Sequence, residues 1–367
     1  MRDEIPQFTP VTLITGFLGS GKTTLLARML ADPALADTAV LINELGEIGL
    51  DHQLLERIDE RTVLLPSGCL CCTVRGELAD AVRDLHSRRA RGDVPAFSRL
   101  VIESTGLADP FPVLTTFHSE SVLKHHFRMA GVVTTVDAVH GARTLAHYAE
   151  SVKQVAVADR IVLTKTDLTG ATAVAALERR VRAINPTAPL RRGGDVANLI
   201  DHTADIHTRD AATESWFNDQ RSATELPERG PHAEGIRAHA LVLDRAIDWT
   251  AFAVWLTMLL NRHGARVLRV KGILNVAGTD APVAVHGVQS LVHAPTHMRA
   301  WPDADRRSRI VFIVKDLERA ALERSLAVFC GLGEAVAAAY TGRTEGDART
   351  CGPMMSSTCC GRWTSDR

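Results

Sequence analysis

Nine residues near the start of the chain have the types and the spacing that phosphate binding requires, because segment 16–24 reads GFLGSGKTT. Glycines allow successive backbone N–H groups to curve around phosphate oxygens, and a helix N-terminus adds partial positive charge. An apolar run at 11–15 and helix formers at 25–30 supply the strand and the helix that flank a P-loop. Lys22 can reach the β- and γ-phosphates, and the Thr23 hydroxyl can bind Mg²⁺. The predicted nucleotide contacts here are Gly16, Gly19, Ser20, Gly21, Lys22, Thr23 and Thr24, with Lys22 also predicted to be catalytic.

Three cysteines lie within four residues: Cys69, Cys71 and Cys72 follow Gly68. An extended strand would place the first two on one face and the third on the other, so the thiols converge only if the segment turns. Thiolates select soft or borderline metals, and Zn²⁺ is the usual choice. Three protein ligands leave one position open, which suits a metal carrier better than a closed structural site. A redox switch and inert thiols are the two alternative interpretations.

A carboxylate ends the apolar run 99–102 at Glu103, and the segment Ser104–Pro110 follows it. In P-loop proteins an acidic residue at this strand end binds Mg²⁺ through water, and the glycine after it, here Gly106, senses the γ-phosphate. A second acidic loop, 43–51, follows the apolar run 39–42. Taken alone, this second loop is better explained as a polar surface turn.

A further strand, 160–163, leads into Thr164-Lys165-Thr166-Asp167-Leu168, which resembles the guanine-binding loop of GTPases. The Asp167 carboxylate can accept hydrogen bonds from N1–H and the 2-amino group of guanine. Adenine offers neither group, so this aspartate predicts a preference for GTP over ATP. Lys165 is expected to lie along the base. GTPases usually have Asn where this chain has Thr164.

Composition excludes several classes of protein. The 42 Lys and Arg nearly balance the 43 Asp and Glu, so the charge does not favour binding to nucleic acid or to anionic membranes. No apolar run is long enough to span a bilayer, and the first residues lack an apolar signal region. We therefore expect a cytoplasmic protein, where seven cysteines are better explained by metal or redox chemistry than by disulfides.

The 367 residues favour two domains. The expected fold class is α/β: a P-loop GTPase domain with a mostly parallel sheet at 1–190, then a linker at 191–235, a small α+β domain at 236–330, and a helix end with a mobile tail at 331–367. First-domain strands are expected at 11–15, 39–42, 62–65, 99–103, 131–137 and 160–163, and helices at 74–91, 139–158 and 171–184. Second-domain strands are expected at 238–243, 267–276, 282–289 and 308–314, and helices at 249–262 and 316–329.

Taken in order, these motifs resemble the CobW family of metal-handling P-loop GTPases, relatives of the urease and hydrogenase nickel chaperones. The glycine-cysteine stretch is the most specific feature. The resemblance implies slow GTP hydrolysis coupled to the transfer of a divalent metal to a client metalloprotein. The implied cofactors are GTP, Mg²⁺ bound at Thr23 and Glu103, and Zn²⁺ or Co²⁺ at the three cysteines. Loop 43–51 becomes a nucleotide-sensing switch in which Glu47 joins Lys22 and Glu103 as a catalytic residue.

Alternatives remain open at this stage. Within the family, the chain could insert cobalt or iron for a cobalamin or nitrile hydratase pathway. Outside it, a regulatory GTPase could sense redox state through its cysteines without transferring metal. The guanine-type loop and the three cysteines argue against a small-molecule kinase, and a homo-oligomer is left open. Further metal or partner roles are considered, and not favoured, for His202, His207, His232, His286, His293, His297, Cys351, Cys359 and Cys360.

Overall fold

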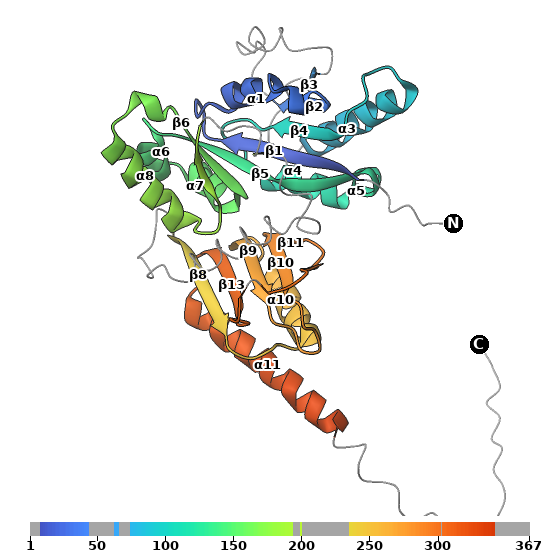
Figure 1. Ribbon diagram of the computed structural model, residues 1–367, viewed down its shortest axis with the longest axis vertical. Helices are drawn as coiled ribbons and strands as arrows, with labels where there is room; N and C mark the ends of the chain where they lie inside the picture. Colours follow the sequence, from blue (N-terminus) through green and yellow to red (C-terminus); the bar gives the residue numbers. More distant parts are fainter. Residues whose placement is uncertain are drawn as a thin grey trace, which may run out of the picture.

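The computed structural model describes residues 8–43, 62–65, 74–193, 199, 235–301 and 303–341. Within these ranges the chain forms two β-sheets, each covered by helices (Figure 1). No helix in the described ranges is long and apolar enough to cross a membrane. Several predicted features lie outside the described residues: Glu47 with most of loop 43–51, Cys69, Cys71, Cys72, His202, His207, His232, Cys351, Cys359 and Cys360.

The first sheet has seven strands in the order β3-β2-β4-β1-β5-β6-β7, and every pairing is parallel. All the loops that follow these strands therefore leave from one edge of the sheet. The expected α/β class with a mostly parallel sheet is confirmed. The strands are β1 (Thr9–Gly16), β2 (Thr38–Asn43), β3 (Thr62–Leu65), β4 (Arg99–Glu103), β5 (Phe127–Asp137), β6 (Arg160–Thr164) and β7 (Leu190–Arg192).

Both faces of this sheet are apolar because both are covered by helices. Side chains alternate along a strand, so Leu13 of β1 packs with α3, α4 and α5, whereas Ile14 packs with α1. The helices are α1 (Lys22–Leu30), α3 (Val74–Arg91), α4 (Phe111–Ser119), α5 (Ser121–His126), α6 (Gly141–His147), α7 (Ala149–Val157) and α8 (Ala171–Ile184).

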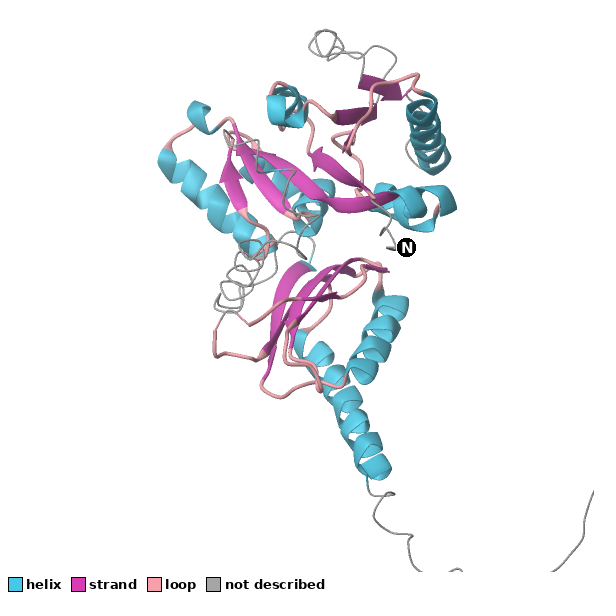
Figure 2. Ribbon diagram, turned by 45° about the vertical axis from the view of Figure 1, so that its right-hand side comes forward, coloured by secondary structure: helices cyan, strands magenta, loops and turns pink. Residues whose placement is uncertain are grey.

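The second sheet is antiparallel, in the order β11-β10-β9-β13-β8 with β12 paired to β10. Helices α10 (Trp249–His263) and α11 (Arg319–Thr341) cover the face turned away from the first domain (Figure 2), where Phe252, Trp255 and Phe312 form the centre of the core. The strands are β8 (Ile236–Leu243), β9 (Val267–Leu274), β10 (Val283–Val288), β11 (Leu291–Val292), β12 (Thr296–His297) and β13 (Ser308–Lys315).

Most predicted elements are present within a few residues, but two helix predictions are wrong. The predicted helix 139–158 is two helices, because Tyr148 between α6 and α7 is extended and its ring packs on Phe17 at 4.6 Å between centroids. The last helix begins at Arg319 and not at Asp316, whose φ of 51° is incompatible with a right-handed helix. Helices α4 and α5, strand β7 and the two-residue strands β11 and β12 were not predicted. The three predicted boundaries between the four segments stay a prediction.

The other face of the second sheet contacts the first domain through α7 and α8. Ile236, Leu268 and Ile313 share a core cluster with residues of these two helices. At the centre of this contact, Arg269 of β9 is 3% exposed and donates a hydrogen bond from Nη1 to the Val157 carbonyl at 2.6 Å. Its Nη2 also pairs with Asp159, directly after α7. A buried cation of the second domain is thus neutralised by the first.

Electrostatics at this interface favour the ionised pair. Burial by itself would raise the pKa of Asp159, but the Arg269 guanidinium and the Val132 N–H hold that pKa well below its ordinary value of 3.8.

His286 and His293 stack nearby, with ring centroids 4.2 Å apart, and burial lowers the pKa of both. His297 lies apart from them, on β12 opposite Val283. No group of three or more potential metal-ligating side chains occurs among the described residues.

The first prediction concerns this ion pair. Arg269→Met should lower the free energy of unfolding at pH 7 by about 3 kcal/mol, because it leaves a largely buried carboxylate without its cation. Since the folded-state pKa of Asp159 is depressed, the pair's contribution is complete above about pH 4 and declines as the pH falls further. The difference between wild type and variant should therefore shrink on acidification. This difference is measured by urea unfolding at several pH values, with circular dichroism as the signal.

Arg237→Met is the matched control. Arg237 lies on β8 of the same sheet but pairs with Glu318, whose side chain is 71% exposed. Exposed pairs contribute less than about 1 kcal/mol, so this control should change stability little. Equal effects of the two substitutions would contradict the role assigned to Arg269.

Candidate nucleotide site

The loop between β1 and α1 has the backbone conformation that the glycine spacing predicts. Gly21, the residue before α1, has a φ of 87°, a backbone conformation that residues with a Cβ atom rarely adopt. Gly16 is required for a different reason, since a Cβ atom there would lie 2.3 Å from Thr135 Oγ1 on β5. The loop is therefore pressed against the sheet at its start and turned sharply at its end. The predicted strand–loop–helix arrangement is present.

Lys22 lies over the loop to which it belongs. Its Nζ donates hydrogen bonds to the carbonyls of Gly16 at 3.1 Å and Phe17 at 3.4 Å, and the residue is 8% exposed. The ammonium is thus held where it can meet phosphates bound by the loop's N–H groups. The side chain of Ser20 points away from that side, because its Oγ lies 2.6 Å from Thr135 Oγ1. The Ser20 N–H donates to the Phe17 carbonyl at 3.0 Å and closes a turn of the loop, so the phosphate contact of Ser20 stays a prediction.

Thr23 and Glu103 are brought together by strand pairing. Glu103 at the end of β4 is in register with Ile14 of β1, one strand away, and is 5% exposed. Thr23 Oγ1 donates a hydrogen bond to Glu103 Oε1 at 2.9 Å. A hydroxyl and a carboxylate are the hard oxygen ligands that Mg²⁺ prefers, so this donor set fits the ion that the P-loop implies.

The loop after β4 is held in place from two sides. Gly106 touches the P-loop so closely that a Cβ atom there would lie 2.6 Å from the backbone nitrogen of Leu18. From the other side, Gln154 of α7 donates from Nε2 to the carbonyls of Gly106 and Ala108, both at 3.2 Å. Gln154 was not predicted from the sequence, because nothing in the local pattern around it signals this contact.

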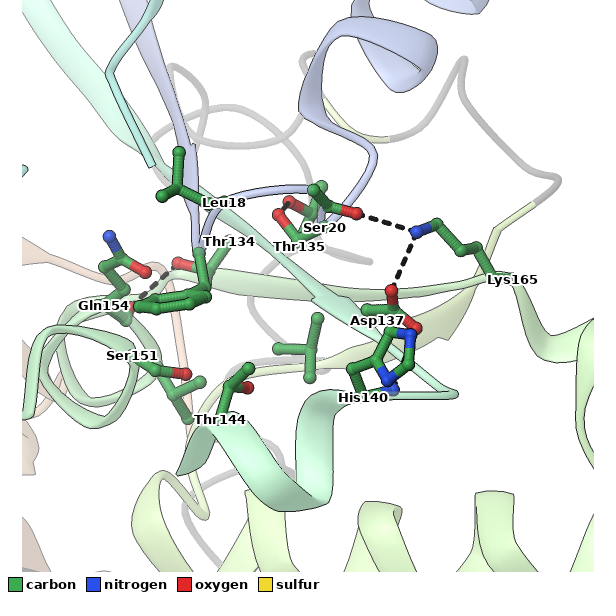
Figure 3. A pocket seen from close by; sticks show the side chains of 14 residues that line it. Leu18, Ser20, Thr134, Thr135, Asp137, His140, Thr144, Ser151, Gln154 and Lys165 are labelled. Carbon is green, nitrogen blue, oxygen red and sulfur yellow. Dashed lines mark hydrogen bonds and ion pairs between the residues drawn. The ribbon is translucent and has the colours of Figure 1, made fainter. Parts of the chain in front are cut away.

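The predicted guanine-binding loop is bonded to the P-loop by two of its own side chains, Thr164 and Lys165, of which Figure 3 shows Lys165. Thr164 Oγ1 donates to the Ser20 carbonyl at 2.7 Å. Lys165 Nζ donates to the Gly19 carbonyl at 2.8 Å and to Asp137 Oδ2 at 2.7 Å. Thr164, which stands where GTPases usually have Asn, thus forms a hydrogen bond to the P-loop through its hydroxyl. Asp167 lies in the short turn 166–168, with its side chain exposed to solvent.

A cavity of about 130 Å³ lies behind the P-loop, between the end of β5 and helices α6 and α7 (Figure 3). Phe17, Ser20, Asp137, Gln154 and Lys165 are among its lining residues. The sequence analysis did not predict a role for Asp137. Its position at the carboxyl end of a strand beside β6 is the signal that could have indicated one.

The fold and this site define the class of protein: a P-loop nucleotide-binding protein in which the P-loop, the Thr23–Glu103 pair and the loop 164–168 meet at the carboxyl edge of a parallel sheet. Family comparison agrees with this class. The model of the CobW/HypB/UreG nucleotide-binding domain matches residues 10–192, and that of the cobalamin synthesis protein cobW C-terminal domain matches residues 236–330. The chain belongs to the CobW family.

Relatives cover nearly the whole length of the chain. It is 35% identical over 326 residues to the zinc chaperone YjiA of Escherichia coli, covering 88% of this chain and 98% of that protein. It is 30% identical over 355 residues to the zinc chaperone CobW of Pseudomonas aeruginosa, covering 86% and 90% of the two chains. The crystal structure of Zn(II)-bound YjiA GTPase from E. coli superposes with a TM-score of 0.65 and 29% identity, over 88% and 99% of the two chains.

The second prediction tests the magnesium ligands. Thr23→Ala should raise the Mg²⁺ concentration needed for half-maximal nucleotide hydrolysis at least about tenfold, the factor that about 1.4 kcal/mol produces. Thr23→Ser is the control, because it keeps the hydroxyl that faces Glu103. The measurement is a Mg²⁺ titration of phosphate release. An unchanged Mg²⁺ requirement in Thr23→Ala would remove Thr23 from the site.

Proposed function

We propose that this chain is a GTP-hydrolysing metallochaperone that binds Zn²⁺ and transfers it to a client metalloprotein. The observation that carries the GTPase half is the docking of the base-binding loop on the P-loop, through Thr164 on the Ser20 carbonyl and Lys165 on the Gly19 carbonyl. The zinc half is supported by the names of the relatives, which include two zinc chaperones and, at 27% identity in Schizosaccharomyces pombe, a zinc-regulated GTPase metalloprotein activator.

Phosphate binding falls to the loop 16–24. Its N–H groups bind the phosphate oxygens, and Lys22 lies between the loop carbonyls and the β- and γ-phosphates. When Mg²⁺ is bound by Thr23 and Glu103, it neutralises charge on the phosphates. Gly106, held by Gln154 and packed on Leu18, supplies a backbone N–H close to the γ-phosphate position. We assign Glu47 to the same reaction as a catalytic residue, on the family resemblance.

Zinc is assigned to the thiolates of Cys69, Cys71 and Cys72. The chain leaves β3 at Leu65, four residues before the first of them, and β3 ends at the same edge of the parallel sheet as β1. The last described residue of β2, Asn43, lies at this edge as well and leads into the predicted switch loop. The described ends of β1, β2 and β3, after which the P-loop, the predicted switch and the cysteine segment follow in the sequence, thus lie at one edge of the sheet, and this supports the proposal.

Client transfer requires thiolates that are reduced and accessible, so we place the protein in the cytoplasm. The fourth zinc position, left open by three thiolates, is where a ligand of the client can enter. We infer that GTP favours metal retention and that hydrolysis favours release, since a carrier must release its metal at the client.

The third prediction tests the coupling of nucleotide and metal. Zn²⁺ affinity should be tighter with a non-hydrolysable GTP analogue than with GDP, and a coupling of about 1–3 kcal/mol corresponds to roughly 5- to 150-fold. Linkage requires Zn²⁺ to raise the preference for the GTP analogue over GDP by the same factor. The measurement is a competition titration against a chromophoric zinc chelator under reducing conditions.

A variant with Cys69, Cys71 and Cys72 all replaced by Ser is the control, and it should lose the high-affinity Zn²⁺ site in both nucleotide states. Equal Zn²⁺ affinity in the two states, or full affinity in the triple variant, would refute the metallochaperone mechanism. Metal content of the protein purified under reducing conditions tests separately whether the cysteines carry metal at all.

The fourth prediction concerns base selection. Asp167→Ala should weaken GTP binding by about 1.5–3 kcal/mol, because it removes a charged acceptor for two donors of guanine. ATP binding should change little, so the preference for GTP should collapse. Competition with a fluorescent nucleotide measures both affinities. A wild-type protein that binds GTP and ATP equally would contradict the guanine assignment.

A further inference from the structure

Asp137 ends β5 with a carboxylate that accepts hydrogen bonds on both of its oxygens. Oδ1 accepts from the backbone N–H groups of Val139 at 2.7 Å and His140 at 3.1 Å, just before α6 begins. Oδ2 accepts from Lys165 Nζ at 2.7 Å. The Asp137 side chain is only 9% exposed, compared with 36% for Asp109 in its pair with Lys153. Asp137 and Lys165 therefore form an ion pair whose acidic partner is shielded from water, which strengthens the attraction.

The ionised state of Asp137 is well supported by its neighbours. Burial by itself would raise the pKa of this carboxyl group, but the hydrogen bonds from Lys165 and from the N–H groups of His140 and Val139 hold its pKa below the ordinary value of 3.8. At neutral pH the group is a full negative charge. The Gly19 carbonyl, the other partner of the Lys165 ammonium, offers only a dipole.

Lys165 has a backbone conformation that needs such support. Its φ of 54° lies in the left-handed region, which a side chain disfavours and which persists only where the surroundings determine it. The Lys165 carbonyl accepts from the N–H of Leu168 and so closes the turn 166–168 that contains Asp167. The anchoring of the Lys165 ammonium therefore determines the orientation of the turn that contains the Asp167 carboxylate.

We propose that Asp137 is a positioning residue for guanine recognition: it anchors Lys165 across the P-loop and thereby orients Asp167, without touching the base itself. Figure 3 shows the arrangement, with Lys165 reaching from the end of β6 to both Asp137 and the P-loop. The inference rests on the proposed function in that it requires the nucleotide to be GTP. It adds Asp137, which lies outside the loop 164–168, to the residues that determine base selection.

A competing explanation is that Asp137 serves only to close the turn before α6, through its hydrogen bonds with the Val139 and His140 N–H groups. Asparagine separates the two roles, because its carbonyl oxygen can still accept from these N–H groups, and Asn forms such turns as Asp does. The same substitution removes the charge that attracts Lys165. A role in the turn alone predicts no effect of Asp137→Asn on nucleotide selection, whereas the positioning role predicts a clear one.

The experiment measures GTP and ATP affinities of the full chain by competition with a fluorescent nucleotide. Asp137→Asn should weaken GTP binding about tenfold, the lower end of what the loss of a charged hydrogen bond produces. ATP binding should stay within about twofold of wild type, the range of a neutral substitution. Lys165→Met should reduce the preference for GTP in the same way. The double variant should bind GTP no more weakly than Lys165→Met, because Asp137 acts through that lysine.

Asp248→Asn is the matched control, since Asp248 caps α10 through the Ala251 N–H at 2.7 Å in the second domain. It should leave both affinities unchanged, and unfolding midpoints of all variants check that each is folded. Unchanged GTP preference in Asp137→Asn, or losses that multiply in the double variant, would overturn the proposal. If Asp167→Ala still abolishes the preference in that case, the guanine assignment survives and only the role of Asp137 fails.

Discussion

The site depends on one constraint: the carbonyl groups of the P-loop must be bound on the protein side so that its N–H groups remain for phosphate. The carbonyls of Gly16 and Phe17 accept from Lys22, that of Gly19 accepts from Lys165, and that of Ser20 accepts from Thr164. Three side chains from two separate segments thus bind four of the five carbonyl groups from Gly16 to Ser20. A backbone held this way presents an anion-binding concavity before any nucleotide arrives.

This constraint also links phosphate binding to base binding. Lys165 and Thr164 belong to the loop that is to read the base, and their polar groups are used on the P-loop. The Gly19 and Ser20 carbonyls thus depend for these hydrogen bonds on side chains of the loop 164–168. Asp137 shares Lys165 with the P-loop, so the end of β5 belongs to the same hydrogen-bonded unit.

Helix α7 contacts both the nucleotide site and the second domain. Gln154 in its middle donates to the loop that contains Gly106, and the Val157 carbonyl at its end accepts from Arg269 of β9. Asp159, just beyond the helix, completes the pair with Arg269 and is itself held by the Val132 N–H of β5. A short helix of nine residues thus joins the loop after β4 to the C-terminal sheet through hydrogen bonds at both places.

The sequence by itself determined the P-loop motif, the guanine-type motif, Glu103 at a strand end and most of the strands and helices, because these depend on local residue types and spacing. Only the tertiary structure decided which polar groups meet. Asp137 and Lys165 are 28 residues apart, and Gln154 and Gly106 are 48 apart. No local pattern encodes such pairs, since they arise when β5 pairs with β6 and α7 packs beside the loop after β4. The break between α6 and α7 could not be predicted from local sequence either. The residues of this segment favour one continuous helix, but Tyr148 is extended and packs on Phe17.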